Sequence, residues 1–251
     1  MPMTLLCIET STTVCSAALC KEGTPLKQCI CYEGSNHARL LPLYVEELLA
    51  YAREQKMTID AVALSEGPGS YTGLRIGTST AKGICYGLNI PLIPVPTLEV
   101  LCEAAKRNTE YRIQNTDLLC PMIDARRMEV YTNIMMNGEW MNGERAKAVV
   151  VENEESLLSY SPEDGLTSNS EAVSQAKPVY YFGDGAAKCQ EVLKAPNWHY
   201  IPGIVPEAQY VGILAEQSAM TNHQSPIDFA YYEPYYLKEF IAAPSHIKGL
   251  K

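Results

Sequence analysis

The chain of 251 residues lacks several patterns on which common classes of protein depend. Its longest apolar runs fall well short of the roughly 18 residues that a membrane-spanning helix needs, so we expect no contact with a membrane. Its nine cysteines show no C-x-x-C spacing, which argues against a structural zinc site or a dithiol redox site. We interpret them as reduced thiols in the core of a cytoplasmic protein, since the N-terminal residues also lack the basic region of a secretory signal.

Positive charge is scarce as well. The formal net charge is −9, and Arg126–Arg127 is one of few tight basic pairs, with Arg75 isolated elsewhere. A protein that binds nucleic acid unaided needs a basic surface that neutralises phosphates. We therefore expect this chain to reach nucleic acid only through a partner that supplies the positive surface.

Familiar catalytic and nucleotide-binding motifs are also missing. The sequence contains no H-E-x-x-H and no G-x-S-x-G, and no two of its four histidines lie within one helical turn. In the glycine-rich segment Ser65–Gly87, Gly73 is not followed by the Lys-Ser/Thr of a P-loop. The spacing of Gly67, Gly69 and Gly73 does not fit a dinucleotide-binding loop either. Close helix packing remains as the physical interpretation of these glycines.

What the chain does contain is a predicted helix with one face nearly bare of side chains. It follows the apolar strand Ala61–Leu64, and Gly73, Gly77 and Ala81 recur in it every four residues. Residues with this spacing line one stripe of a helix. Because such a stripe lets another backbone approach closely, we expect it to meet a partner helix.

The order of predicted elements occurs twice along the chain. The first half contains strands over Thr4–Glu9, Val14–Cys20 and Leu26–Tyr32, a helix over 35–56, the strand Ala61–Leu64, the glycine-rich helix, the strand Leu92–Val95 and a helix over Thr97–Arg107. The second half contains strands over Leu118–Ile123, Glu129–Met136, Lys147–Val151, Val179–Phe182 and His199–Ile201, with helices over Asn153–Tyr160, Ala186–Leu193 and Glu207–Met220.

This repetition predicts an α/β protein with two lobes of ribonuclease-H-like topology. That is the arrangement of the actin, sugar-kinase and Hsp70 superfamily (ASKHA). We expect a first lobe over residues 1–108 and a second over 109–230, whose last helix packs back on the first lobe, followed by a C-terminal tail over 231–251. The polar stretch Ser161–Lys177 is expected to be a solvated loop.

Three turns are candidates for a binding site between the lobes. The turn Glu9–Thr13 combines an acid with hydroxyls, Asp124–Arg127 occupies the equivalent hairpin of the second half, and Gly183–Gly185 precedes a helix. Backbone N–H groups and hydroxyls in such turns can hold phosphate oxygens, so we expect Thr10, Ser11 and Asp184 to contact a cofactor. A capped hairpin, a solvated surface hairpin and a plain tight turn remain the respective alternatives.

Six segments of the sequence closely resemble the TsaB (YeaZ) family. They are IETSTTVCSAAL, NHARLLP, SEGPGSYTGLRIGTSTAKGICYG, DARRMEVY, FGDGAAK and EPYYLK, in this order along nearly the whole chain. The resemblance implies a two-lobed ASKHA protein that is a non-catalytic subunit in making threonylcarbamoyladenosine beside the tRNA anticodon. It implies TsaD, the catalytic paralogue, and TsaE, an ATPase of the same pathway, as partners, with tRNA reached only through the complex.

The resemblance also implies a pseudo-enzyme. TsaD binds a metal through two histidines spaced H-x-x-x-H after the strand that follows its glycine-rich helix, and Thr97 and Leu101 stand at those positions here. Leucine has no lone pair to give a metal, and a lone hydroxyl is a weak ligand. We therefore expect no metal and no cofactor that this chain itself requires, although ATP or ADP could occupy the interlobe cleft or the partner interface.

The resemblance places the partner on the first two helices, which in the family pack against the same helices of TsaD or of a second copy. We therefore assign this interface to His37, Leu41, Tyr44, Leu48, Tyr71, Gly73, Leu74, Gly77 and Ala81. Two other functions are weighed against this one. A nucleotide-dependent kinase or ATPase would use the turns Glu9–Thr13 and Gly183–Gly185, and a peptidase would need a metal or nucleophile motif that the sequence lacks.

Overall fold

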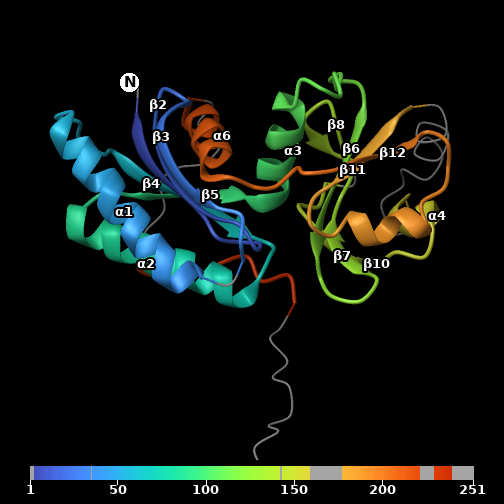
Figure 1. Ribbon diagram of the computed structural model, residues 1–251, viewed down its shortest axis with the longest axis horizontal. Coiled ribbons are helices and arrows are strands. Elements are labelled where there is room, and N and C mark those ends of the chain that lie inside the picture. Colours follow the sequence, from blue (N-terminus) through green and yellow to red (C-terminus); the bar gives the residue numbers. More distant parts are fainter. Residues whose placement is uncertain (1–2, 35, 142, 159–176, 221–228, 239–251) are drawn as a thin grey trace, which may run out of the picture.

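The computed structural model describes residues 3–34, 36–141, 143–158, 177–220 and 229–238. Two lobes lie side by side, each built on its own β-sheet (Figure 1). Helix α3 (Thr97–Arg107) stands at the boundary between them and packs on β6 of the second lobe. Helix α3 therefore lies between the two sheets, and the ends of their central strands face each other at the lobe boundary.

The sheet of the first lobe has five strands in the order β3-β2-β1-β4-β5. Strands β1, β2 and β3 form an antiparallel meander, and β4 and β5 run parallel to β1. The bounds are Thr4–Glu9 for β1, Cys15–Lys21 for β2, Thr24–Cys31 for β3, Ala61–Gly67 for β4 and Leu92–Pro96 for β5. Glu22 and Gly23 both have positive φ, which makes a tight hairpin turn between β2 and β3.

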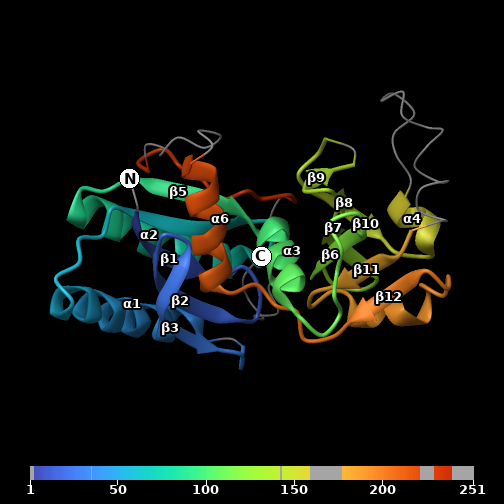
Figure 2. The same cartoon turned by 90° about the horizontal axis from the view of Figure 1, so that it is seen from above.

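Helices cover both faces of the first sheet. Helices α1 (His37–Glu54) and α2 (Tyr71–Leu88) lie on one face, and α6 (Ala208–Met220) crosses the strands on the opposite face (Figures 1 and 2). Because both faces are covered, β1 is buried along its whole length. Leu6 and Ile8 belong to the core under α1 and α2, whereas Leu5 and Cys7 belong to the core under α6.

The sheet of the second lobe follows the same plan, in the order β10-β7-β6-β11-β12. Strands β6, β7 and β10 are antiparallel, and β11 and β12 run parallel to β6. The bounds are Leu118–Asp124 for β6, Glu129–Thr132 for β7, Lys147–Val150 for β10, Val179–Phe182 for β11 and Trp198–Ile201 for β12. The shared strand order confirms the predicted duplication of a ribonuclease-H-like unit.

Some predicted elements of the second lobe are wrong in detail. The predicted strand Glu129–Met136 ends at Thr132, and Met135–Met136 (β8) pairs with β6 and with Glu139–Trp140 (β9). The break lies at Asn133, whose side chain donates to the Glu144 carbonyl at 2.6 Å and accepts from the next backbone N–H. Such local bonds compete with the strand ladder.

One predicted helix of the second lobe is shorter than expected, and another reaches the end of the described residues at Leu158. The segment predicted as a helix over Ala186–Leu193 is a 3₁₀ helix over Ala187–Glu191, and α4 covers Glu154–Leu158. The expected loop Ser161–Lys177 lies almost wholly outside the described residues. All nine cysteines are free thiols and all but Cys31 are buried, as the sequence predicts.

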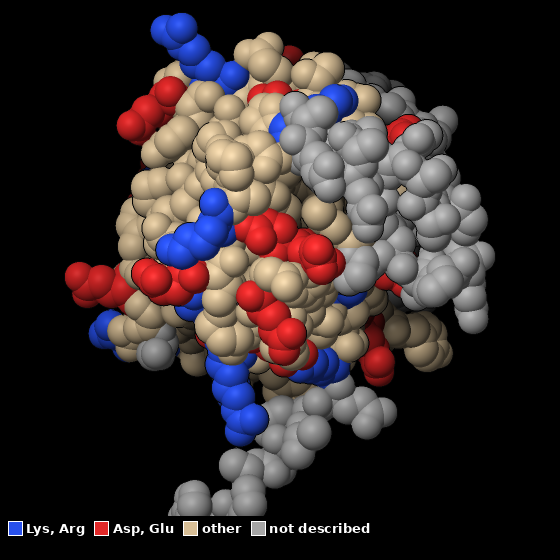
Figure 3. Space-filling model, turned by 90° about the vertical axis from the view of Figure 1, so that its right-hand side faces the viewer, with Lys and Arg blue, Asp and Glu red and all other residues tan. Residues whose placement is uncertain are grey.

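No helix among the described residues is both long and apolar enough to cross a membrane. On the face of the second lobe seen in Figure 3, the acidic and basic side chains that are drawn in colour are interspersed, and they form no continuous basic patch. This surface is consistent with the net charge of −9.

Candidate functional site

A cleft of about 470 Å³ opens between the lobes, at the ends of their central strands. It combines the turn after β1, the first turns of α1 and α2, and the end of β6. Its lining residues are Ser11, Thr12, Thr13, His37, Ala38, Ser70, Thr72, Gly73, Ile76, Ile123, Asp124 and Asp184. The structure thus brings the three predicted turns together, with Ser11, Asp124 and Asp184 at one cavity.

The first-lobe wall of the cleft is held by hydrogen bonds of the turn after β1. The backbone N–H of Ser11 donates to Glu9 Oε1 at 2.6 Å, and its carbonyl accepts from the N–H of Ser70 at 2.6 Å. Unlike the backbone groups of Ser11, its side-chain hydroxyl has no hydrogen-bond partner among the described residues, and it is buried. Buried polar groups in folded proteins nearly always have a partner, so this hydroxyl is a candidate contact for a bound ligand.

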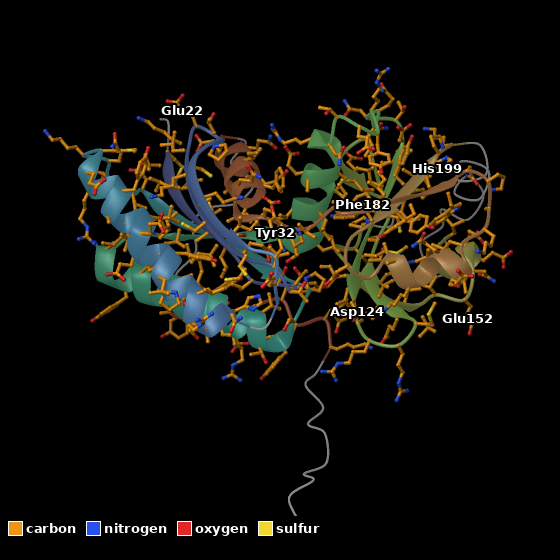
Figure 4. The ribbon with its side chains drawn as sticks, in the orientation of Figure 1. Glu22, Tyr32, Asp124, Glu152, Phe182 and His199 are labelled. Carbon is orange, nitrogen blue, oxygen red and sulfur yellow. The ribbon has the colours of Figure 1, made fainter. Side chains whose placement is uncertain are left out.

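The second-lobe wall carries two carboxylates. Asp124 lies at the end of β6, at the lobe boundary in Figure 4, and its N–H donates to Asp184 Oδ1 at 3.0 Å. Lys188 forms an ion pair with Asp124. Burial raises the pKa of the Asp184 carboxyl, and the negative charge of Asp124 adds to this rise. The wall therefore favours a ligand group that is neutral or positively charged.

Glu9 is fully buried behind this cleft. Burial raises the pKa of its carboxyl, the neighbouring Ser11 and Ser65 act in the opposite direction, and Asp184 adds to the rise. Glu9 Oε2 has no hydrogen-bond partner in the described part of the chain. The site thus holds three carboxyl groups, and none of its described lining residues is a lysine or arginine. A bare phosphate would meet no side-chain cation there.

Thr10 was expected to contact a cofactor, but it is not among the residues that line the cleft. Its side chain is fully buried, and Thr10 Oγ1 donates to the carbonyl of Gly73 at 2.8 Å. The hydroxyl therefore fixes the first turn of α2 to the end of β1 and does not face the cleft. Ser11 and Asp184 do line the cleft, and their contact with a cofactor stays a prediction.

His37 was expected at a partner interface but lines the cleft instead. It is buried, and its Nε2 lies 3.2 Å from the Val14 carbonyl, which can only accept, so this nitrogen donates. Ser70 and Thr72, at the first turn of α2, are lining residues that the sequence analysis missed. Their place was predictable, because helix α2 begins where β4 ends, next to the turn after β1.

The glycine stripe of α2, which was expected to meet a partner helix, faces the sheet of its own lobe in the structure. A Cβ built on Gly73 would lie 2.1 Å from the Thr10 carbonyl oxygen, and one on Gly77 would lie 2.3 Å from Thr10 Oγ1. Ala81 is fully buried in the same core. The stripe lets α2 approach β1 of its own lobe. Periodicity predicted the stripe but could not show which backbone it meets.

Most other residues assigned to the interface are also buried within the first lobe. Leu41 and Leu48 are fully buried, Leu74 is 2% exposed, and Tyr44 packs partly buried against the same core. Tyr71 is partly exposed, and its ring contacts the ring of Tyr236 in a tilted arrangement. The inward stripes of both helices therefore form the lobe's core.

The outward faces of the same two helices carry exposed apolar residues instead. Tyr86 on α2 is 80% exposed, and Leu43 on α1 is 55% exposed. Gly83 and Gly87 lie on the same side of α2 as Tyr86, and a Cβ on either would meet nothing within 4 Å. This surface, which we call the α1/α2 outward face, combines apolar side chains with room for another helix.

Thr97 and Leu101, at the positions where TsaD is expected to hold its metal, are used for packing. The Thr97 hydroxyl lies 2.7 Å from Ser65 Oγ and accepts from the N–H of Gly67 at 3.0 Å. Leu101 is fully buried. Among the described residues, no group of three or more His, Cys, Asp or Glu side chains is placed to hold a metal ion.

Comparison with known proteins places these features in a family. The family model for tRNA N6-adenosine threonylcarbamoyltransferase (TsaD) matches residues 33–243. The tRNA threonylcarbamoyladenosine biosynthesis protein TsaB of Bacillus subtilis is 37% identical over 133 residues, or 53% of this chain and 55% of that protein. TsaB of Haemophilus influenzae is 34% identical over 129 residues, or 51% and 52%. The chain spans about half the length of these curated relatives.

A solved structure extends the likeness over nearly the whole chain. YeaZ from Pseudomonas aeruginosa superposes with a TM-score of 0.68 at 26% identity, and covers 94% of this chain and 100% of that one. The duplicated fold and these matches agree with the resemblance that the sequence motifs indicate. The chain belongs to the family that the TsaD model describes, and within it to the TsaB (YeaZ) group.

Proposed function

We propose that this chain takes part in the synthesis of threonylcarbamoyladenosine in tRNA, as a non-catalytic subunit that binds a catalytic paralogue of the TsaD type. The family membership supports the pathway, because the relatives carry names of tRNA threonylcarbamoyladenosine biosynthesis proteins. The packing roles of Thr97 and Leu101 support a subunit without a metal centre of its own. The tRNA is then contacted chiefly by the partner, as the acidic charge requires.

The observation that carries the proposal is the α1/α2 outward face. Exposed large apolar side chains at Leu43 and Tyr86 lie on the outward sides of these two helices, and on α2 Gly83 and Gly87 lie beside Tyr86. Apolar side chains next to glycines suit helix-to-helix docking, because they bury area while the backbones come close. The docking site is therefore on the helices that the sequence indicated, but on their opposite faces.

The test is the affinity between the purified chain and the TsaD-type paralogue of the same organism, measured by calorimetry. Gly83→Leu and Tyr86→Ser should each weaken binding by about tenfold or more, because one blocks the approach and the other removes an anchor. A Cβ at Gly83 would meet nothing within 4 Å, and leucine has a higher helix propensity than glycine, so the fold is expected to persist.

The matched control is Val150→Ser, which removes a 56% exposed apolar side chain from β10 of the second lobe. It should leave the affinity unchanged. If Gly83→Leu and Tyr86→Ser bind the paralogue as wild type does, the docking site is wrong. If wild type does not bind the paralogue at all, the subunit role is wrong.

A second copy of the chain would compete for the same face, whereas TsaE would not. A homodimer would appear as a concentration-dependent mass in sedimentation of the isolated chain, and Gly83→Leu should abolish it if it uses this surface. TsaE is expected to join through the complex, so it should bind a mixture of both subunits more tightly than this chain alone.

Nucleotide binding is the second candidate function, and the buried Ser11 hydroxyl without a partner favours it. The α2 N-terminus beside it suits an anion, and Asp184 could hold a magnesium ion. Titration of the chain with ATP in the presence of magnesium tests this, with Asp184→Asn as the variant that should lose binding. If the titration of the wild-type chain with ATP and magnesium shows no heat of binding, nucleotide binding is excluded as a function.

A further inference from the structure

A short C-terminal segment, residues 229–238, connects the docking helix α2 with the second lobe. It runs below the lobe boundary in Figure 1, after the last described residue of α6 and the range 221–228. We call it the clamp segment. Its contacts fall into three groups, on the first lobe, at the turn between β4 and α2, and on the second lobe.

On the first lobe the clamp segment is anchored to α2 and to the core beneath it. Tyr232 is 8% exposed and belongs to the core under α1 and α2. Lys82 Nζ donates to the carbonyl of Ala230 at 3.2 Å, and the rings of Tyr71 and Tyr236 lie 5.0 Å apart. Both Lys82 and Tyr71 are residues of α2, so the segment follows this helix.

At the turn between β4 and α2 the clamp segment contacts backbone directly. The N–H of Tyr235 donates to the Glu66 carbonyl at 2.8 Å. A Cβ on Gly67 would lie 2.6 Å from the carbonyl oxygen of Tyr235, and Gly67 has a φ of +116°. Any side chain at position 67 would therefore push the segment away.

On the second lobe the clamp segment ends in an ion pair. Lys238 Nζ contacts the Glu129 carboxylate on β7, and Tyr235 and Leu237 pack against the core that includes Phe182. A second link runs beside it, because Arg145 of the second lobe pairs with Glu66 of β4 at 2.9 Å. The segment thus touches α2, the turn before it and a strand of the other lobe within ten residues.

We propose that the clamp segment fixes the second lobe against α2, and that docking of the partner on α2 is coupled to the arrangement of the lobes. The coupling rests on the proposed function, whereas the clamp itself is a property of the isolated chain. A change that loosens the clamp should weaken docking, and by reciprocity the bound partner should protect the clamp segment. The affinity for the partner then depends on the position of the second lobe, although the α1/α2 outward face belongs to the first lobe.

The first experiment reverses the ion pair. In the isolated chain, Lys238→Glu should speed amide hydrogen exchange of Tyr235 and its neighbours roughly two- to fivefold, which is the range for an exposed ion pair. Adding Glu129→Lys should restore the wild-type rate. The control is the reversal of a pair within the second lobe, Lys194→Glu with Glu191→Lys, which should leave the exchange of residues 229–238 unchanged.

The same variants are then titrated with the TsaD-type paralogue. Lys238→Glu should weaken the affinity roughly two- to fivefold, and the double variant with Glu129→Lys should recover it. This rescue separates coupling from direct contact, because a partner that touched Lys238 would still meet the wrong charge in the double variant.

A second pair of variants tests the clamp at its turn. Gly67→Ala should displace the Tyr235 carbonyl, raise exchange of the clamp segment more than tenfold and weaken docking by a similar factor. Gly203→Ala is the control, because Gly203 also has a left-handed φ, of +74°, but a Cβ there meets nothing within 4 Å. Exchange in residues 229–238 and docking should stay at the wild-type level in this control.

The outcomes separate the two proposals. Exchange rates of the clamp segment that are unchanged in both Lys238→Glu and Gly67→Ala would overturn the clamp. Faster exchange with unchanged docking affinity would overturn the coupling while the subunit role stands. If the paralogue binds neither wild type nor any variant, the proposed function fails. The hydrogen-exchange rates of residues 229–238 then still decide whether the clamp exists.

Discussion

Glycines of helix α2 serve two different surfaces, although they share one spacing. Gly73 and Gly77 face β1, where a side chain would collide with Thr10, whereas Gly83 faces outward and has open space. A glycine in a helix interior costs stability through its backbone entropy. Gly73 and Gly77 are therefore required by packing, whereas Gly83 lies in an open position and is not required by packing within the chain.

Substituting alanine at Gly73 and at Gly83 should give opposite results. Gly73→Ala is expected to lower the free energy of unfolding by about 3 kcal/mol or more, because its Cβ would lie 2.1 Å from a buried carbonyl oxygen. Gly83→Ala should raise it by about 0.5–1 kcal/mol through helix propensity. Urea unfolding measures both. A similar loss for the two variants would contradict the orientation of α2.

The buried carboxyl of Glu9 should make stability depend on pH. Its folded pKa is raised from the ordinary 4.5, so the folded chain holds this proton to higher pH than the unfolded chain does. Stability is therefore lost as the pH rises from about 4.5 through the folded pKa of Glu9.

Glu9→Gln should remove this loss. The gain in unfolding free energy over wild type is expected to be larger at pH 8 than at pH 4, by about 1 kcal/mol or more. Glutamine can still accept the 2.6 Å bond from Ser11 through its carbonyl oxygen. Urea unfolding of both proteins across pH 4–8 gives the comparison, and parallel pH profiles would show that Glu9 does not titrate in this way.

At the scale of elements, hydrogen bonds from two neighbouring elements hold the turn between β4 and α2 in place. The Thr10 hydroxyl of the β1–β2 turn bonds to the first turn of α2, and the Thr97 hydroxyl at the start of α3 bonds to Ser65 and Gly67. These bonds join four elements around the cleft. The position at which TsaD is expected to carry a metal ligand is thus used here to set backbone geometry.

Thr97→Val should destabilise the fold without changing the shape of the side chain. It leaves the N–H of Gly67 and the hydroxyl of Ser65 without their partner in a buried site, which is expected to cost about 1–3 kcal/mol. Thermal unfolding measures the loss, with Thr58→Val on the exposed segment before β4 as the control. Equal melting temperatures for wild type and Thr97→Val would argue against this role.

At the scale of the whole molecule, an ion pair joins the lobes beside the clamp segment. Arg145 pairs with Glu66, which is only 7% exposed. Burial raises the pKa of Glu66, and Arg145 acts against that rise. The arginine is itself half exposed, so the pair links a solvent-accessible loop of the second lobe to the core of the first.

Arg145→Ala should lower the free energy of unfolding by about 1–2 kcal/mol at pH 7. Without the guanidinium the folded pKa of Glu66 rises further, so the loss relative to wild type is present at neutral pH and shrinks as the carboxyl is protonated in both proteins. Urea unfolding at pH 7 and pH 4.5 measures this. The double variant with Glu66→Gln should recover most of the loss, and a loss that is the same at both pH values would exclude the carboxyl as its cause.

The sequence by itself determined the elements and their order. Strand composition and helical period placed β1 and α3 at their observed bounds, and the repeated order predicted two lobes with the same strand arrangement. Local patterns suffice for this because period and turn chemistry depend on neighbours along the chain. The same motifs identified the family.

Only the tertiary structure decided which faces of these elements are free. A stripe of small residues has the same period whether it meets its own sheet or a partner, so the sequence could not tell that Gly77 faces Thr10 and Gly83 faces outward. The cleft, the pairing of Arg145 with Glu66 and the path of residues 229–238 join positions far apart in the chain. Such contacts depend on how whole elements pack, which no local pattern records.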